Sequence, residues 1–273
     1  MRSKLFVPAA RPELFEKALA SDADAISFDL EDSVSIEGKA AARSRLIEFL
    51  RGDVARSSAK RLIVRINALG TPFAEEDLSA LANSATHIIN VPKVEDPETV
   101  AAIAAMTEFP LLLTIETPGG LRRGAEIAAA HRRVIGLQVG LNDLFEPLGI
   151  DRRDPNNVHA ALWQIRLSAG DAGCFAFDGA WPDIEDEAGF RAEAALAHRL
   201  GYLGKSCIHP RQVPLANAAF QDSFTPDEAR RLLAVAEKAA TRGEGAFAFE
   251  GRMIDRPAIE RAKAVLASAR AGE

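Results

Sequence analysis

The sequence predicts a (β/α)8 barrel followed by a C-terminal helical extension. Eight short apolar runs alternate with Ala-rich amphipathic segments between residues 4 and 220. The runs are continuously apolar rather than alternating, which is typical of parallel strands covered on both faces. A doubly wound open sheet is the main alternative, and the eight strand-then-helix repeats favour the barrel.

Each repeat has the length of one β-then-α unit. The predicted strands are 4–8, 25–29, 62–66, 87–91, 110–116, 134–139, 174–177 and 204–208. The predicted helices are 13–20, 39–50, 76–83, 97–106, 120–130, 157–169, 187–200 and 211–220. Two more helices, 226–241 and 256–269, flank a glycine-rich connection that reads as turns. We therefore expect a catalytic barrel over 1–222 and a helical lid extension over 223–273.

Composition excludes several classes of protein. The net charge of −6 argues against a general nucleic-acid partner, and 48% hydrophobic residues suffice for a large core. The N-terminal apolar run is too short for a signal peptide, and no run approaches the ~18 apolar residues of a membrane span. Cys174 and Cys207 lie at neither CxxC nor zinc-ligand spacing. We expect reduced thiols in a cytoplasmic protein without a membrane partner.

Polar residues follow most of the predicted strands, where a parallel barrel gathers its chemistry. They are Asp29, Glu31, Asp32, Arg65, Asn67, Lys93, Glu95, Glu116, Asn142, Asp143 and His209. Any one of them could simply cap a helix, and His209 is better explained as a packing or positioning residue. Glu116 and Asp143 follow neighbouring strands, and carboxylate oxygens suit Mg²⁺, which one or two carboxylates normally hold. This pair is the candidate metal site.

Ten short motifs give these residues a further meaning. They are Leu5-Phe-Val-Pro8 with Arg11-Pro12, Asp29-Leu-Glu-Asp32, Lys39 with Ala42-Arg43, Val64-Arg-Ile-Asn67, Pro92-Lys93, Ile115-Glu116-Thr, Asp143-Leu144, Cys207-Ile-His-Pro210, Gly245-Ala-Phe and Gly251-Arg-Met-Ile-Asp255. In this order they resemble the citrate lyase β-subunit-like branch of the HpcH/HpaI aldolase/citrate lyase family. Each motif alone is weak, but ten in order across residues 3 to about 268 are specific.

The resemblance implies a phosphoenolpyruvate/pyruvate-type TIM barrel that assembles as a trimer or hexamer. It implies Mg²⁺ on Glu116 and Asp143, and contact of Arg65 with the oxygen and carboxylate of a 2-oxo acid. Asp255 would lie on a C-terminal lid and act as the acid/base in the active site of a neighbouring subunit.

Other positions carry weaker implications from the same resemblance. Glu31 and Asp32 would support the site from behind, and Arg11 and Lys39 would meet the phosphates of coenzyme A. Many relatives carry an acid where this chain has Asn142, whose amide could still bond a metal-bound water.

The implied activity is retro-Claisen cleavage of a malyl-, citramalyl- or citryl-CoA to acetyl-CoA and a 2-oxo acid. Three alternatives stay open: a (3S)-malyl-CoA-type thioesterase, an aldolase acting on free hydroxy acids, and a non-catalytic subunit of a lyase complex that uses an acyl-carrier protein. The acyl group and the 2-oxo acid are not identified by the sequence.

Overall fold

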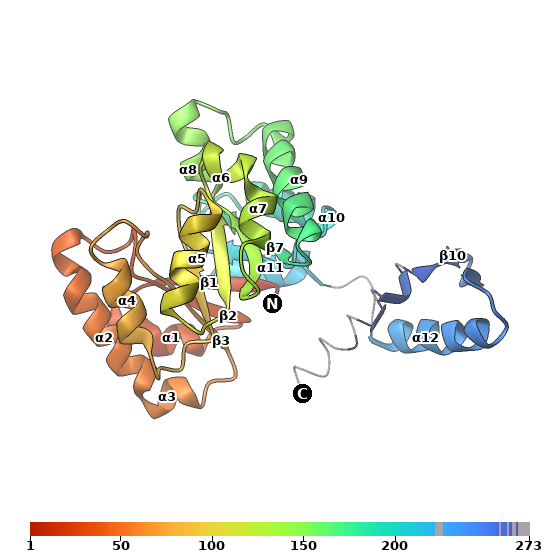
Figure 1. Cartoon of the computed structure of the whole chain (residues 1–273), viewed down its shortest axis with the longest axis horizontal. Coiled ribbons are helices and arrows are strands. Elements are labelled where there is room, and N and C mark those ends of the chain that lie inside the picture. Colours follow the sequence, from red (N-terminus) through yellow and green to blue (C-terminus); the bar gives the residue numbers. More distant parts are fainter. Residues whose placement is uncertain (222–225, 257, 261, 264–265, 267–273) are drawn as a thin grey trace. The chain divides into compact units, whose positions relative to one another are not determined.

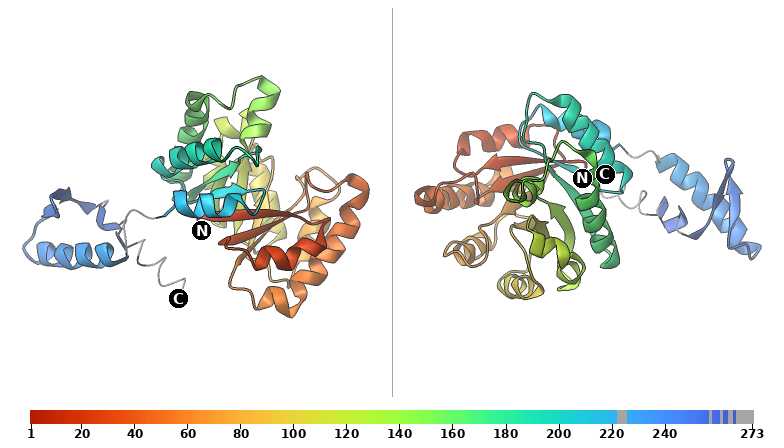
Figure 2. Two further views of the ribbon diagram at one scale, coloured as in Figure 1. Left: turned by 180° about the vertical axis from the view of Figure 1, so that it is seen from behind. Right: turned by 90° about the horizontal axis from the view of Figure 1, so that it is seen from above.

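The barrel predicted from the eight repeats is confirmed. The computed structural model describes residues 1–221, 226–256, 258–260, 262–263 and 266. Eight parallel strands close into one barrel, each paired with the next and the last with the first (Figures 1 and 2). The strands are β1 (Ser3–Pro8), β2 (Ala25–Asp29), β3 (Arg61–Arg65), β4 (Ile88–Val91), β5 (Leu111–Ile115), β6 (Val134–Val139), β7 (Phe175–Ala180) and β8 (Lys205–Cys207).

Helices surround the strands (Figure 2). They are α1 (Phe15–Leu19), α2 (Lys39–Arg51), α3 (Asp53–Arg56), α4 (Ala74–Leu81), α5 (Pro97–Met106), α6 (Pro118–Arg122), α7 (Gly124–Ala129), α8 (Leu141–Phe145), α9 (Pro155–Asp171), α10 (Glu187–Arg199) and α11 (Gln212–Ala219). Short 3₁₀ turns occupy Pro12–Leu14, Ile36–Gly38 and Glu146–Leu148. The helix predicted at 120–130 is broken, because Arg123 leaves the helical conformation with φ −101° and ψ 13°. Asp96, at the start of α5, accepts a hydrogen bond from Thr99 N at 2.7 Å and so caps that helix.

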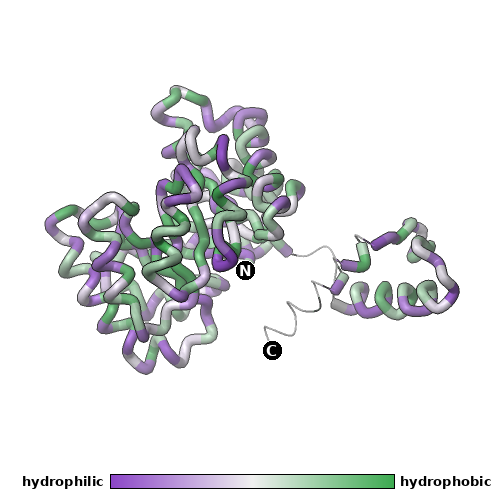
Figure 3. Tube along the Cα trace, in the orientation of Figure 1, coloured by the Kyte–Doolittle hydropathy of each residue, from purple (hydrophilic) through white to green (hydrophobic). Residues whose placement is uncertain are grey.

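The main hydrophobic core lies between the barrel wall and the helices, and hydrophobic residues predominate along the strands in Figure 3. A smaller apolar cluster, which includes Ile63, Leu112 and Phe177, is separate from it. On β5 the inward side of the barrel carries Leu112 and Thr114, and Glu116 continues it, because alternate residues share a face. The barrel interior therefore changes from apolar to polar toward the carboxyl ends of the strands.

The chain divides into two compact units, Met1–Phe220 and Gln221–Glu273. The predicted boundary at 222/223 lies outside the described residues, as does part of the predicted helix 256–269. The second unit contains α12 (Pro226–Thr241) and an antiparallel hairpin of β9 (Phe247–Phe249) and β10 (Arg252–Ile254). None of the described helices has the length and apolarity needed to cross a membrane.

The hairpin is a feature that the sequence did not predict. Its two loop residues, Glu250 and Gly251, both have positive φ (47° and 79°), as a tight hairpin turn requires. Glu-Gly is a weaker hairpin signal than Asn-Gly or Asp-Gly, so the segment was expected to be turns only.

Candidate active site

A cavity of about 440 Å³ opens at the carboxyl ends of the barrel strands. Its lining residues are Phe6, Pro8, Asp29, Asp32, Ser33, Arg65, Thr114, Glu116, Gln138, Val139, Gly140, Leu141, Asn142, Asp143, Arg152, Ala180 and Ile208. They come from seven of the strands and the loops that follow them, which is where barrel enzymes carry their chemistry. Glu116, Asp143, Arg65 and Asp32 are thus brought together as residues of one cavity.

Glu116 directly follows β5 and is 2% exposed. Its Oε1 accepts a hydrogen bond from Lys93 N at 2.7 Å. Gly140 gives this side chain its space, because a Cβ there would lie 2.5 Å from both Cβ and Oε2 of Glu116. Burial, followed by the nearby carboxylates of Glu31 and Asp143, raises the pKa of Glu116 to about 8.

Asp143 lies in α8, directly after β6, and is exposed to the same cavity. Among the described residues no group of three or more His, Cys, Asp or Glu side chains is arranged to hold a metal ion. A cation here would therefore rest on two carboxylates, with water or substrate at its other positions. That donor set fits Mg²⁺. After burial, the carboxylates of Glu31 and Asp143 also raise the pKa of Glu116, and a cation would offset their negative charge.

Arg65, the last residue of β3, also lines the cavity and lies at the centre of an acidic cluster. Its Nε and Nη2 donate to the two carboxylate oxygens of Asp29 at 2.7 and 2.8 Å. Its Nη1 lies 3.2 Å from Glu31 Oε2 and 3.5 Å from Asp32 Oδ2. Burial opposes its charge, yet Asp29 and then Glu31 hold the pKa of Arg65 above its ordinary value. The guanidinium is thus rigidly oriented before any substrate arrives.

Lys93 contacts both Glu116, which follows β5, and Glu31, which follows β2. It adopts a left-handed conformation (φ 53°), which a non-glycine residue adopts only when its surroundings fix it. In this conformation its N–H bonds Glu116, while its Nζ lies 2.7 Å from Glu31 Oε1. Glu31 and Asp32 therefore support Arg65 and Lys93 within one ion-pair cluster.

The two residues expected to meet coenzyme A phosphates differ from each other in their surroundings. Lys39 is buried, and its Nζ donates to the carbonyl oxygens of Leu30 and Glu31 at 2.9 and 2.8 Å. Its ammonium is thus used to hold the loop after β2 and is not presented to a coenzyme phosphate. Arg11 is exposed and forms a surface ion pair with Glu13.

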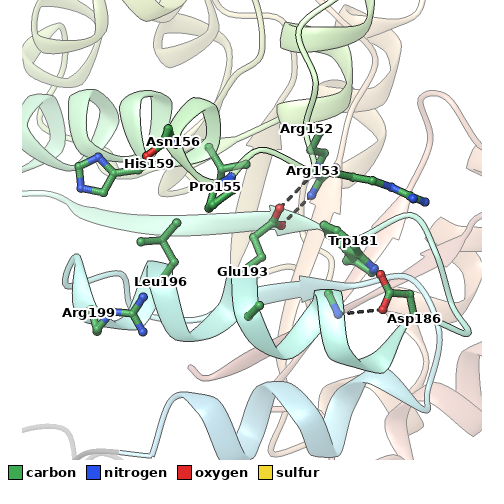
Figure 4. A pocket seen from close by; sticks show the side chains of 13 residues that line it. Arg152, Arg153, Pro155, Asn156, His159, Trp181, Asp186, Glu193, Leu196 and Arg199 are labelled. Atoms are coloured by element: carbon green, nitrogen blue, oxygen red, sulfur yellow. Dashed lines mark hydrogen bonds and ion pairs between the residues drawn. The ribbon is translucent and has the colours of Figure 1, made fainter.

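Asn142 also has a partner that the sequence did not reveal. Its Oδ1 accepts a hydrogen bond from Arg152 Nη1, so the amide oxygen faces that guanidinium rather than only a metal-bound water. Arg152 in turn pairs with Glu193 at 2.7 Å (Figure 4). It also borders a second cavity of about 560 Å³ between α9 and α10. Asn142 thus anchors the segment that carries Asp143.

A buried ion network continues behind Arg152. Lys205 in β8 is fully buried, and its Nζ lies 2.7 Å from both Asp178 Oδ2 and Glu193 Oε1. Burial raises the pKa of Asp178 to about 6, although Lys205 opposes this shift. The network joins β7, β8 and α10 behind the rim of the cavity.

Replacing Asp29 with Asn is expected to lower kcat/KM by about 100-fold, because the amide N–H₂ would face the Arg65 donors and displace the guanidinium. Steady-state kinetics measures this loss. Asp24→Asn is the matched control, since Asp24 accepts the same two-pronged contact from Arg2 at the opposite end of the barrel. Equal activity losses in the two variants would contradict a specific role for Asp29.

Sequence reasoning gave no role to five residues that the structure places in or beside this site. They are Lys4, Lys93, Gln138, Arg152 and Lys205. Lys93 stood in a motif, and the available signal for Lys4 and Gln138 was a polar residue within an otherwise apolar strand.

Comparisons with known proteins agree with this fold. The family model described as HpcH/HpaI aldolase/citrate lyase matches residues 2–210. Citrate lyase subunit beta of Escherichia coli (strain K12) is 36% identical, with 98% of this chain and 93% of the relative covered. Two proteins of Cereibacter sphaeroides are similar to the same extent. A (3S)-malyl-CoA thioesterase is 37% identical, covering 99% of this chain and 95% of its own. An L-malyl-CoA/beta-methylmalyl-CoA lyase is 36% identical, covering 98% and 94%.

Among solved structures, protein CitE from Mycobacterium tuberculosis in complex with magnesium, acetoacetate and coenzyme A matches with a TM-score of 0.76. It is 37% identical, and the match covers 100% of both chains. The family model and the near full-length relatives lead to one conclusion: the chain belongs to the HpcH/HpaI aldolase/citrate lyase family.

Proposed function

We propose that this protein is a Mg²⁺-dependent carbon–carbon lyase that cleaves a 3-hydroxyacyl-CoA of the malyl, citramalyl or citryl type. The products would be acetyl-CoA and a 2-oxo acid. The observation that carries this proposal is the single cavity that Glu116 and Asp143 line together with a preoriented Arg65. It is supported by similarity to a malyl-CoA lyase and to a structure in complex with magnesium, acetoacetate and coenzyme A.

Glu116 and Asp143 would hold the cation, which when bound supplies Lewis-acid polarisation of the substrate hydroxyl and its neighbouring carboxylate. As the carbon–carbon bond breaks, the hydroxyl passes its proton to solvent water and becomes the carbonyl of the 2-oxo acid. Arg65 stabilises the negative charge on that oxygen, since Asp29 and Glu31 already hold the guanidinium in place. The electron pair of the broken bond passes to the thioester fragment as an enolate, whose carbon then takes up a proton.

Asp255 is our candidate for the residue that delivers this proton, as the lid aspartate of a neighbouring subunit. Asp255 is exposed directly after β10, and Met253 beside it is 83% exposed. Both are free to meet another surface, which supports a homotrimer or hexamer whose sites are completed between chains. We further propose a cytoplasmic location and a coenzyme site that includes the exposed Arg11.

Asp255→Ala is expected to leave 2-oxo acid binding unchanged while abolishing exchange of the acetyl-CoA methyl protons with solvent. Nuclear magnetic resonance in D₂O follows the exchange, and calorimetry follows the binding. Met253→Ala is the control on the same hairpin, because it shortens the neighbouring side chain without removing an acid. Continued exchange in Asp255→Ala would assign the acid/base to another group.

Thioester hydrolysis is the second candidate, because the chain is 37% identical to a (3S)-malyl-CoA thioesterase. With malyl-CoA as the substrate, the products distinguish the two activities. Hydrolysis gives malate and free coenzyme A, whereas carbon–carbon cleavage gives glyoxylate and acetyl-CoA. Incubation with Mg²⁺ and a panel of hydroxyacyl-CoAs, with thiol and 2-oxo acid both measured, makes the test. Turnover of free hydroxy acids would instead indicate an aldolase. Turnover only with an acyl-carrier protein would indicate a complex subunit, as the relative named citrate lyase subunit beta suggests.

A further inference from the structure

The barrel interior directly beneath the cavity is polar. Lys4 from β1, Asn90 from β4, Thr114 from β5 and Gln138 from β6 are all buried there, at most 4% exposed. Barrel interiors are dominated by Val, Ile and Leu, and burying polar groups costs free energy unless they are hydrogen-bonded. Departures from such a pattern are concentrated at functional sites.

Hydrogen bonds fix how these four side chains are turned. Asn90 Nδ2 donates to Thr114 Oγ1 at 2.9 Å and to the carbonyl of Leu112 at 3.0 Å, so its Oδ1 is left toward Lys4. Lys4 Nζ lies 3.5 Å from that oxygen and donates to Gln138 Oε1. This hydrogen bond turns the oxygen of the Gln138 amide toward Lys4. The Gln138 N–H₂ group is therefore turned away from Lys4.

Gln138 also forms part of the cavity lining. It pairs in register with Thr114, and both lie one layer below the proposed metal site, since Glu116 is two residues beyond Thr114 on the same face. In the described part of the chain, Gln138 Nε2 has no protein acceptor. A donor without a partner thus faces the bottom of the cavity.

We propose that Gln138, positioned by Lys4, determines which 2-oxo acid the site accepts by donating a hydrogen bond to an oxygen on the acid's outer substituent. This inference rests on the proposed function. All 2-oxo acids have the carboxylate and the 2-oxygen, which Arg65 and the cation on Glu116 and Asp143 would bind at the rim of the cavity. Gln138, at the bottom of the cavity, would contact the substituent that differs between them. That substituent is hydrogen in glyoxylate, methyl in pyruvate and carboxymethyl in oxaloacetate.

The basic side chains of Lys4 and Arg65 favour an anionic substituent on the 2-oxo acid. Lys4 Nζ lies 4.3 Å from the centre of the Phe6 ring, and the Arg65 guanidinium lies 5.0 Å from it, so two basic side chains lie near this ring, one beneath the cavity and one at its rim. A carboxylate on the outer substituent would therefore lie near both basic side chains. The substrate class is therefore a dicarboxylic 2-oxo acid, derived from a citryl-type thioester.

Calorimetric titration of the full-length protein with Mg²⁺ and each of glyoxylate, pyruvate and freshly dissolved oxaloacetate tests this inference. Wild type is expected to bind oxaloacetate most tightly. In Gln138→Leu the affinity for oxaloacetate should fall about 10- to 100-fold, the range for losing a hydrogen bond to a charged group. Glyoxylate and pyruvate should change much less. Gln138→Glu, which keeps a partner for Lys4 but presents an acceptor to the cavity, should lose the same preference.

Lys4 is tested as a positioning residue by its effect on selectivity. Lys4→Met should reduce the oxaloacetate preference, and Lys4→Met/Gln138→Leu should regain thermal stability without regaining the preference. Ile63→Val, in the apolar cluster, is the control that changes packing without changing selectivity. Equal weakening of all three acids, or a wild-type preference for pyruvate, would overturn the assignment to Gln138. If wild type bound none of the three acids, the proposed function itself would fall, and this inference with it.

Discussion

Glu116→Gln and Asp143→Asn are each expected to abolish Mg²⁺-dependent turnover, lowering kcat by roughly 1,000-fold or more. Lewis-acid activation supplies several kcal/mol of barrier reduction, and each ~1.4 kcal/mol is a factor of ten. Each substitution removes one of the two carboxylates proposed to hold the cation, while the amide that replaces it keeps the shape of the side chain. Mg²⁺ titration by calorimetry should show a matching loss of affinity.

Stability provides the control for this experiment. Because burial raises the pKa of Glu116 to about 8, its carboxyl group is largely neutral at pH 7 when no cation is present. Glutamine imitates that neutral form, so the melting temperature of Glu116→Gln should change little. Near-normal turnover in both variants would refute the metal assignment, whereas a collapse in stability would point to misfolding instead.

Lys205→Met is expected to destabilise the protein by about 3–5 kcal/mol, which is the usual cost of removing one partner from a buried ion network. The substitution would leave Asp178 and Glu193 beside each other without the cation that lies 2.7 Å from both. For a domain of this size the melting temperature should fall by roughly 6–20 °C. Thermal unfolding followed by circular dichroism measures the change.

A surface pair supplies the comparison for Lys205. Arg211 lies 3.2 Å from Glu185, but both side chains are largely exposed. Arg211→Met should therefore cost less than about 1 kcal/mol, because water screens such pairs. Similar melting temperatures for Lys205→Met and wild type would show that the buried network adds no net stability.

The barrel could be predicted because each strand is encoded locally. A strand buried on both faces reads as a continuous apolar run, and the observed strands lie within a few residues of the predicted ones. The hairpin of β9 and β10 was missed because Glu250-Gly251 is an uncommon choice for a tight turn. The break at Arg123 was missed because nothing at that position forbids a continuous helix.

The site was predictable only as far as strand ends reveal it. Glu116 and Asp143 follow strands and Arg65 ends one, so the geometry of a parallel barrel brings all three to the same end, where they line one cavity. The partners of Lys39, Asn142 and Gln138 depend on which side chains meet across the fold, and no local pattern encodes that. Asp255 belongs to the second unit, and its role stays a prediction.

The polar layer beneath the cavity constrains how this protein can evolve. Lys4 and Gln138 lie 134 positions apart in the chain, yet each supplies the other's buried partner. A single apolar replacement would strand a donor or an acceptor at a cost of about 1–3 kcal/mol, a sizeable share of the ~5–15 kcal/mol that keeps a protein folded. Substitutions at positions 4 and 138 should therefore be correlated among homologues. Mutant libraries that vary position 138 alone would contain mostly destabilised variants. Libraries that vary positions 4 and 138 together would include stable variants in which the buried layer beneath the cavity has a different polarity.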